Sequence, residues 1–428
     1  MPVQMSSASV SLLPYVSVQS DWESVVDDVA SGKTRTDSFW VSCYRKGTPS
    51  VHGSVQVYKN QSEPIYVEME GENSIQVQRI HDKSFRISCP SFEIENVTIS
   101  APAASFKNEK NPYTSLDISP GGELFVVGGD NGNLKIGDTS TGDIRRELRG
   151  HVGDITTCRF FPSGQVILSG ATDFQLKIWS VLDGSCPVTL KGHKMGVLDT
   201  AIIVRGRNVL SSSRDGTIRL WECASADTIR TMGNYSCPVN KIALGIRMEG
   251  SASQDNYNLD TREVETQDKL VVAALDDGSL RGIDLASKDE IFNLNASQLS
   301  VPLISCSYAS ELNLIATGSA EGIITVYDVR NLNSALLTFQ RSEFPIYDIH
   351  FMDEDGFPSL LVAEGGGSAF RTSSLLDASN LRSVQEFTGF DMDPVMGVRV
   401  HSYDRRRVVY LAGRDKYDGC VRKYDIIA

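Results

Sequence analysis

Two sets of serine, histidine, aspartate and tryptophan residues recur in the chain with the same internal spacing. The sets lie 42 residues apart and comprise His151, Ser169, Asp173 and Trp179, then His193, Ser211, Asp215 and Trp221. Serine, histidine and aspartate are the groups of a hydrolytic triad. With the tryptophan they also form a complete row, from indole N–H to hydroxyl, imidazole and carboxylate. We favour this structural row because neither oxyanion donors nor a substrate space accompanies either serine.

The period of these landmarks indicates how the elements that carry them are arranged. Landmarks that recur every 42 residues are typical of WD-type repeats, each of which forms one four-stranded blade of a β-propeller. Weaker repeats occupy 113–138, 237–244 with 269–284, 303–328, 345–370 and 394–425. The sequence therefore predicts an all-β fold, a seven-bladed WD40 propeller, because single blades cannot bury their own faces.

A small α+β domain is expected over residues 1–92, and the propeller over residues 93–428. A helix is predicted at 20–32, with Ser20 and Glu23 as a capping box and Gly32 as its end. Strands are expected at 38–44, 52–58, 64–69, 74–80 and 84–89.

The two ends of the propeller and one of its repeats carry further signals. The last repeat ends without an outer strand, so we expect a strand near 92–100 to close the ring. The polar, acidic segment 249–267 interrupts the fourth repeat and contains few residues that could join a core. It is predicted to be a disordered insertion.

Composition excludes several functional classes. The chain of 428 residues carries 41 basic and 54 acidic side chains, a net charge of −13, which argues against a nucleic-acid partner. The eight cysteines form no CxxC pair, so neither a metal cluster nor a cofactor is expected. Neither a signal peptide nor a membrane-length apolar run is evident. We expect a monomer in the cytoplasm, with the nucleus as a second location.

Binding is expected at the loops of the ring rather than in a catalytic centre. No Walker loop, HExxH or GxSxG motif is found, so an enzyme is not expected. Acidic residues near the predicted turns are candidates for contact with a basic partner. These candidates are Asp154, Asp276, Glu321, Glu364, Asp391 and Asp393.

Several segments resemble one family, the proteasomal ATPase-associated WD-repeat factors. The resemblance is carried by 158–180 and 192–223, with RGRNV at 205–209 more distinctive than generic repeat signals, and by SDWESVV, FRISCP, DPVMGVRV and DGCVRKY elsewhere. Gly137 and Asp138 depart from the usual Trp-Asp end of a repeat. The resemblance implies an assembly chaperone of the proteasome regulatory particle. Such a chaperone binds the C-terminal domain of a proteasomal ATPase subunit in base intermediates.

Two alternatives remain open at this stage. Tyr327, Asp328, Val329 and Arg330 resemble the WDxR box of substrate receptors for cullin-type ubiquitin ligases, with tyrosine in place of tryptophan. The second alternative is a propeller enzyme. The proteins that copurify with the chain would distinguish a ligase adaptor from a proteasomal ATPase.

Overall fold

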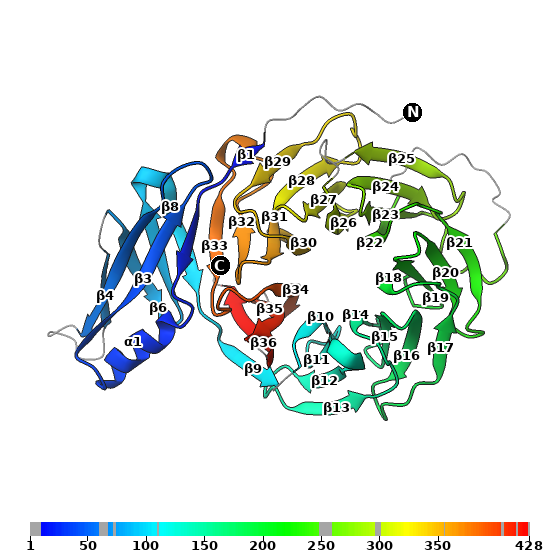
Figure 1. The fold of residues 1–428 in the computed structure, drawn as a ribbon, viewed down its shortest axis with the longest axis horizontal. Helices are drawn as coiled ribbons and strands as arrows, with labels where there is room; N and C mark the ends of the chain where they lie inside the picture. The colour runs from blue at the N-terminus through cyan, green and yellow to red at the C-terminus, as the bar shows by residue number, and fades with distance from the viewer. Residues whose placement is uncertain are drawn as a thin grey trace.

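A ring of β-sheets and a smaller domain at its side make up the molecule (Figure 1). The computed structural model describes residues 10–59, 67–71, 74–108, 111–247, 259–295, 301–354, 356–403, 406–416 and 418–426. Within these ranges the ring contains seven blades, which confirms the predicted seven-bladed propeller. The blades follow one another in chain order, so each polar landmark of the sequence takes an equivalent place in its own blade.

The first three blades are regular antiparallel sheets of four strands. Blade one contains β10 (Tyr113–Ile118), β11 (Leu124–Gly129), β12 (Leu134–Asp138) and β13 (Ile144–Leu148). Blade two contains β14 (Ile155–Phe160), β15 (Val166–Ala171), β16 (Gln175–Ser180) and β17 (Val188–Lys191). Blade three contains β18 (Val197–Ile202), β19 (Asn208–Ser213), β20 (Ile218–Glu222) and β21 (Thr228–Met232).

The next three blades keep this order but vary at their outer edges. Blade four contains β22 (Val239–Ile246), β23 (Lys269–Leu275), β24 (Ser279–Asp284) and β25 (Glu290–Asn295). Blade five contains β26 (Leu303–Ala309), β27 (Leu314–Ser319), β28 (Ile323–Asp328) and β29 (Leu337–Gln340), to which β1 (Ser11–Leu12) adds in parallel. Blade six contains β30 (Ile346–Glu354), β31 (Phe357–Glu364), β32 (Ala369–Thr372) and β33 (Ser383–Phe387).

Hydrophobic cores lie between neighbouring blades rather than inside single blades. One core joins Val126 and Leu134 of blade one to Ile155, Ile167 and Trp179 of blade two. The alternation of side chains along each strand gives every blade two apolar faces, and each face packs on a neighbour. Every blade is therefore needed to bury the next one.

The ring closes through a strand that we placed wrongly in the sequence. Blade seven consists of β34 (Val395–Tyr403), β35 (Arg406–Asp415), β36 (Asp418–Ile426) and β9 (Ala104–Asn108). Strand β9 pairs antiparallel with β36, opposite Lys423 to Gly419. The segment expected to close the ring is instead β8 (Ile94–Ser100), which pairs in parallel with β33 of blade six. A second strand after β8 is needed to reach β36, and its short, weakly apolar sequence gave no signal.

In its described residues, the N-terminal domain contains one α-helix and two sheets. One sheet has the order β2 (Tyr15–Val18), β3 (Thr36–Tyr44), β4 (Val51–Lys59) and β5 (Val67–Gly71). The other contains β6 (Gln76–His81), β7 (Ser84–Cys89) and β8, and β8 continues it into blade six. The Trp22 indole N–H donates to Thr388 Oγ1 at 2.9 Å. Shared strand pairing and this buried bond attach the domain to the ring.

Helix α1 (Trp22–Ser31) packs one face on the sheets, as its spacing predicts. Trp22, Val26 and Val29 are buried, and Gly32 ends the helix with a left-handed φ of 82°. The predicted capping box is wrong, because the helix begins after Asp21 without a side-chain cap and Glu23 pairs with Lys83. Among the described residues, no helix combines the length and apolar character needed to cross a bilayer.

Short 3₁₀ turns complete the described secondary structure. They are η1 (Pro90–Phe92), η2 (Asp130–Gly132) and η3 (Ala378–Asn380).

The second half of the predicted disordered insertion is packed against blade three. Asn208 Oδ1 accepts the Val264 N–H at 2.7 Å, and the buried carboxylate of Glu263 pairs with Arg230. The prediction of disorder is therefore wrong for 259–267, because these polar residues find partners on a neighbouring blade. Residues 248–258 lie outside the described residues.

Closure through β9 predicts a stability effect for Phe106. Its ring stacks on Phe125 of blade one with centroids 6.0 Å apart, so this side chain joins the closing strand to the next blade. Phe106→Ala should lower the free energy of unfolding by about 2–3 kcal/mol, because a partly buried aromatic contact is lost. Urea denaturation measures this change. Phe357→Ala is the control, since Phe357 is 61% exposed, and equal losses would contradict the role of β9.

Candidate functional site

The predicted polar row is present in blade two. The Trp179 indole N–H donates to Ser169 Oγ at 2.8 Å, and Ser169 Oγ lies 2.8 Å from His151 Nε2. The opposite ring nitrogen, Nδ1, lies 2.8 Å from Asp173 Oδ2. Every donor in this row faces an acceptor, so the buried polar groups are satisfied and hold the blade in one conformation.

Blade three repeats the row with the second set. Ser211 Oγ lies 2.8 Å from the Trp221 indole nitrogen and 2.7 Å from His193 Nε2, and His193 Nδ1 lies 3.0 Å from Asp215. Burial lowers the pKa of both histidines, so each imidazole is neutral and donates from Nδ1. Burial alone would raise the pKa of Asp215, but hydrogen bonds from Thr217, the Lys194 N–H and His193 hold it at about 2.

The row is built for stability and for loop placement rather than hydrolysis. Ser169 and Ser211 have no exposed surface, and each serine already accepts an indole N–H. Each aspartate also accepts a backbone N–H from the loop that follows its histidine, from Val152 at 3.1 Å and from Lys194 at 2.8 Å. The rows therefore fix the loops on one face of the ring.

We call this face the tetrad face, after the rows of four polar side chains that fix its loops. It is defined by the loops at one end of the blades. Antiparallel strands place the loops before each first strand and after each second strand at the same end. The described loops are 111–112, 130–133, 149–154, 172–174, 192–196, 214–217, 233–238, 276–278, 301–302, 320–322, 341–345, 365–368, 388–394 and 416. All six acidic candidates lie on these loops or at the strand ends next to them.

The structure separates the six candidates into three groups. Asp154, Asp276, Glu321 and Asp391 are exposed. Asp393 is half-buried, and its carboxylate accepts the Lys416 N–H at 2.6 Å. Glu364 is only 2% exposed. Four of the six can therefore reach a partner without any rearrangement of the chain.

The expectation for Glu364 as a surface contact is wrong. Its carboxylate accepts from Arg341 Nη2 at 2.7 Å and from Arg341 Nε at 3.1 Å, and Ser368 Oγ lies 2.9 Å away. Arg341 also bonds Glu386 at 2.6 Å and stacks on Phe370, 3.8 Å from the ring centroid. The partner Arg341 lies in the loop that leads from blade five into blade six, where the sequence analysis assigned no partner to Glu364.

Three exposed apolar side chains on the tetrad-face loops around blade two were missed by the sequence analysis. Val152, Phe174 and Met195 are 85%, 46% and 48% exposed. Their loops touch, because a Cβ on Gly153 or Gly196 would meet atoms of Thr172 within 3.3 Å. Val152, Phe174 and Met195 are hereafter the apolar cluster. Exposed apolar side chains grouped on one face are a candidate contact site for another protein.

Phe174 occupies a turn position that is glycine in five other blades. The equivalent glycines are Gly132, Gly216, Gly278, Gly322 and Gly367, all with φ between 72° and 83°, and the equivalent residue in blade seven is Lys416 at φ 61°. Phe174 takes the same left-handed conformation at φ 69°, although a bulky side chain is unfavourable there. Alignment of the blade turns within the sequence would have revealed this substitution.

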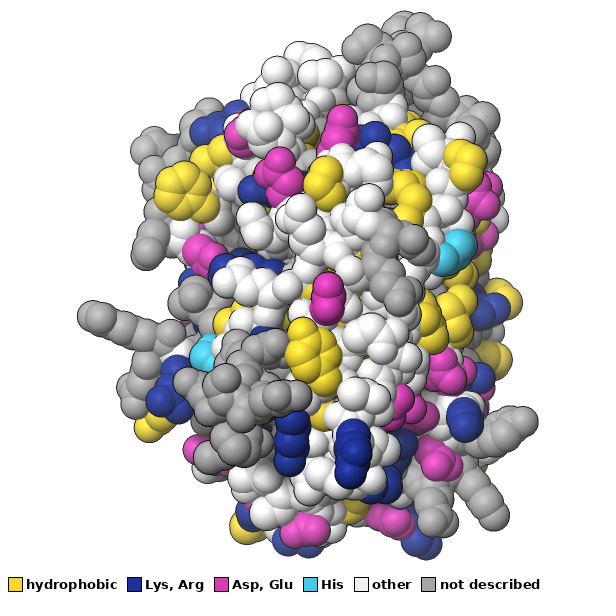
Figure 2. Space-filling model, turned by 90° about the vertical axis from the view of Figure 1, so that its left-hand side faces the viewer, with side chains coloured by type: hydrophobic (Ala, Val, Ile, Leu, Met, Phe, Trp, Pro, Cys, Tyr) yellow, Lys and Arg dark blue, Asp and Glu magenta, His cyan; other side chains and the backbone are white. Residues whose placement is uncertain are grey.

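Charges divide the tetrad face into sectors. Lys194 and Arg214 are exposed beside the apolar cluster in blade three, whereas blades four and five present Asp276 and Glu321. Blade seven is mixed, because Lys416 is exposed near Asp391. Exposed acidic candidates therefore occupy only part of this face. Asp276, Glu321 and Asp391 are hereafter the acidic sector. Figure 2 shows a different pattern on the side of the N-terminal domain, where basic and acidic side chains are interspersed.

Charged side chains that line the central channel form ion pairs with one another. Its cavity of about 390 Å³ is lined by inner strands, and Arg399 joins Asp117 at 3.1 Å to Asp348 at 2.7 Å. Asp348 also accepts the Val398 N–H of the next blade at 3.1 Å. Burial, with the nearby Arg399, lowers the pKa of His350 to about 4, so this imidazole is neutral. These charges connect blades.

Metal ligation finds no support in the arrangement of side chains. In the part of the chain that the structure describes, no three His, Cys, Asp or Glu residues are grouped as a metal site. The eight cysteines are free thiols, and burial raises the pKa of Cys158 and of Cys306 to about 12. These thiols are therefore protonated and unreactive at neutral pH.

The row in blade two predicts a stability effect without a chemical one. Asp173→Ala leaves His151 and the Val152 N–H without their acceptor, which should cost about 1–3 kcal/mol of unfolding free energy. Thermal and urea unfolding measure the loss. Asp277→Ala is the matched control, because Asp277 has the same position in blade four but Ala273 and Ile283 replace the serine and tryptophan. A loss no larger than the control's would contradict the structural role of the row.

Comparison with known proteins relates the chain to one family. WD-domain G-beta repeats match residues 101–138, 142–180 and 184–222, and the N-terminal domain model of nucleolar protein 10-like proteins matches 243–367. Proteasomal ATPase-associated factor 1 of Gallus gallus is 39% identical over 96% of this chain and 98% of its own length. The Homo sapiens protein of that name is 39% identical, again covering 96% and 98%.

A more distant organism gives the same result. Probable proteasomal ATPase-associated factor 1 of Dictyostelium discoideum is 38% identical over 95% of this chain and 96% of its own length. Because such similarity extends through both the N-terminal domain and the ring, the chain belongs to the proteasomal ATPase-associated factor 1 family of WD-repeat propeller scaffolds.

Proposed function

We propose that the protein is a non-catalytic assembly chaperone of the proteasome regulatory particle. In this role its tetrad face binds the C-terminal domain of a proteasomal ATPase subunit in intermediates of the base. The name of the relatives supports an ATPase partner, and the strained, exposed Phe174 is the observation that carries the choice of face. We expect the monomer to act in the cytoplasm, with the nucleus as a second location.

The apolar cluster supplies what a protein contact needs in its centre. Aromatic and methionine side chains provide most of the affinity in such contacts, because they exclude water over a large area. Phe174 keeps an unfavourable backbone conformation that glycine would relieve, and strain of this kind is concentrated at functional sites. Contact with a partner would use this ring, which is 46% exposed in the free chain.

The acidic sector suits a partner with a basic surface. Glu321 and Asp391 are exposed, and neither forms an ion pair with a described residue. Such charges raise the association rate and set the orientation of the partner more than they raise affinity. The overall charge of −13 favours neither nucleic acid nor an anionic membrane surface as a ligand.

Catalysis is not part of the proposal. The serine–histidine–aspartate sets lie in packed blades, with no exposed surface at either serine. A nucleophile that no substrate can touch performs no chemistry. The proposal therefore predicts no hydrolytic activity from either set.

The ubiquitin-ligase alternative receives less support from the residues that suggested it. Tyr327 is fully buried, and Arg330 is held by Asp328 through a contact of 2.6 Å. In a WDxR box of a substrate receptor, this arginine would have to be free to contact the ligase adaptor. Affinity purification of the tagged chain with mass spectrometry distinguishes the two functions. Proteasomal ATPase subunits in the eluate support the chaperone, whereas a cullin-ligase adaptor without ATPases would replace it.

Phe174→Gly should separate stability from binding. The change relieves a left-handed strain of about 1–2 kcal/mol, partly offset by the greater unfolded-state freedom of glycine, so the free energy of unfolding should stay equal or rise by about 1 kcal/mol. Affinity for the purified C-terminal domain of the copurifying ATPase should fall at least about tenfold. Calorimetry and urea denaturation give the two numbers. Unchanged affinity would remove Phe174 from the interface.

Charge reversal on blade five tests the acidic sector with a matched control. Glu321 and Glu311 are both exposed, but Glu311 lies in the loop between β26 and β27, on the opposite face. Glu321→Lys and Asp391→Lys should each weaken binding by about 1 kcal/mol, roughly fivefold, at low salt. Glu311→Lys should leave the affinity unchanged. Calorimetry in low and high salt measures this, since salt screens exposed charges.

Two results would count against the acidic sector. Equal effects of Glu321→Lys and Glu311→Lys would show that only net charge matters. A loss that persists undiminished in high salt would show that the reversals act through packing rather than charge.

A further inference from the structure

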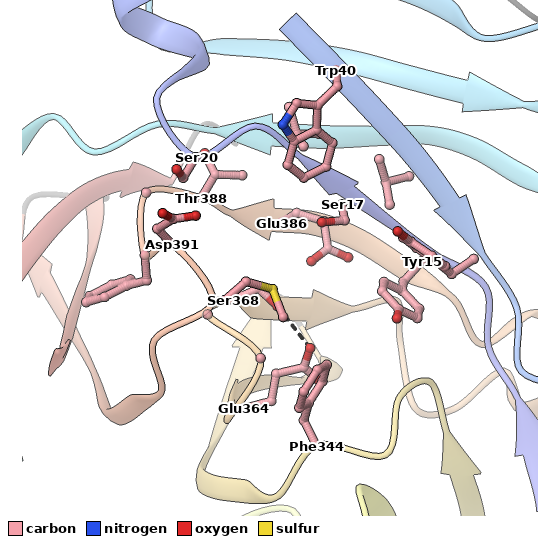
Figure 3. A pocket seen from close by; sticks show the side chains of 18 residues that line it. Tyr15, Ser17, Ser20, Trp40, Phe344, Glu364, Ser368, Glu386, Thr388 and Asp391 are labelled. Carbon is pink, nitrogen blue, oxygen red and sulfur yellow. Dashed lines mark hydrogen bonds between the residues drawn. The ribbon is translucent and has the colours of Figure 1, made fainter. Parts of the chain in front are cut away.

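A cavity lies where the N-terminal domain meets the tetrad face. It has a volume of about 300 Å³, between strands β2 and β3 on one side and the loops of blades six and seven on the other (Figure 3). The lining combines aromatic side chains with carboxylates, and no described lining residue is lysine, arginine or histidine. The cavity therefore offers negative charge and π faces without a cation of its own in the wall.

One carboxylate oxygen in this cavity lacks a partner. Glu386 is 2% exposed, and its Oε1 accepts from Arg341 Nη1 at 2.6 Å. Its Oε2 is buried and has no hydrogen-bond partner among the described residues. Figure 3 shows the Glu386 carboxylate directed into the cavity, beside Ser17 and Tyr15. A buried carboxylate oxygen left unpaired is unfavourable, so a donor from outside the chain would be bound there.

The neighbouring carboxylate differs from Glu386, because both of its oxygens accept hydrogen bonds. Glu364 also lines the cavity, but both of its oxygens are occupied, by Arg341 and by Ser368 and Ser342. Arg341 directs its hydrogen bonds to Glu364, Ser368 and Glu386 Oε1, and none of them reaches Glu386 Oε2. The unmet acceptor is therefore specific to Glu386. Burial raises the pKa of Glu386 to about 7, as expected for an acid that lacks a full set of donors.

The aromatic wall is suited to a cation. Trp40 is 47% exposed at the cavity, and no described cation lies over its ring. The chain already places one guanidinium against an aromatic of this wall, since Arg341 lies 5.0 Å from the Tyr15 centroid. Indole faces attract ammonium and guanidinium groups, most strongly where water is partly excluded.

We propose that this cavity binds the cationic side chain of a lysine or arginine from an extended segment of a partner protein. The cation would donate to Glu386 Oε2 and lie against Trp40, with Asp391 adding negative charge at the side of blade seven. A peptide fits better than a free ion, because the apolar wall accommodates the methylene groups that precede the charge. The inference goes beyond the proposed ATPase contact and does not depend on it.

Tryptophan NMR of the full chain tests the proposal directly. The chain has four tryptophans, so ¹⁵N-tryptophan labelling gives four indole signals. Trp40 lines the cavity, and Trp22 donates to Thr388, which also lines it. Trp179 and Trp221 lie in the polar rows of blades two and three and serve as internal controls. Trp40→Phe assigns the Trp40 signal.

The probe is N-acetyl-arginine methylamide, compared with the neutral isostere N-acetyl-citrulline methylamide. The arginine compound should shift the Trp40 and Trp22 signals saturably and leave Trp179 and Trp221 in place. The citrulline compound should bind at least tenfold more weakly. Equal shifts by the two compounds, or no shift at Trp40 up to the solubility limit, would overturn the proposal.

Variants test the named groups. Glu386→Gln should weaken the arginine compound at least tenfold, whereas Glu311→Gln, on an exposed loop of blade five, should have no effect. Wild-type affinity of Glu386→Gln would overturn the proposal. If Glu386→Gln does not fold, the affinity of Trp40→Ala for the arginine compound is measured instead, from the shift of the Trp22 indole signal. A loss of threefold or more supports the site, and wild-type affinity rejects it.

Discussion

Closure of the ring by β9 is the constraint on which the rest of the structure depends. Within the ring, hydrophobic cores join neighbouring blades, so an open edge at blade seven would weaken the packing of blade seven on blade one. Strand β9 prevents this by pairing with β36 and by stacking Phe106 on Phe125. The first matched repeat begins at residue 101 and therefore contains β9, so a repeat of the sequence spans two blades. Because the sequence repeat begins one strand before the structural blade, the first repeat connects blade seven to blade one and closes the ring.

A closed ring can hold loops whose backbone conformations are unfavourable on their own. The two polar rows fix the loops of blades two and three through backbone bonds to Asp173 and Asp215. On this support Phe174 keeps a conformation that five other blades give to glycine. The N-terminal domain is attached just as firmly, because β8 belongs to its sheet and to blade six. Rigid placement of exposed apolar groups lowers the entropy lost on binding, which favours a scaffold role.

Sequence reasoning succeeded where signals are local and failed where partners are distant. The repeats and both polar rows follow from residues within one period of 42. Strand β9 was missed because its partner β36 lies more than 300 residues away and its own pattern is weak. Glu364 was misplaced although Arg341 is only 23 residues away, because an arginine–glutamate pair is not one of the landmarks of the repeat. The packing of 259–267 depends on Asn208 of another blade. Phe174 was available from the sequence, through comparison of equivalent turns.

Hydrogen–deuterium exchange of the full chain, with and without the purified C-terminal domain of the ATPase, tests the central claim most directly. The account predicts slower exchange in the tetrad-face loops 149–154, 172–174 and 192–196, and in 388–394 of blade seven. Loops on the opposite face, such as 161–165, 203–207 and 310–313, should exchange unchanged. Protection confined to the opposite face, or no protection at a saturating concentration of the domain, would contradict it.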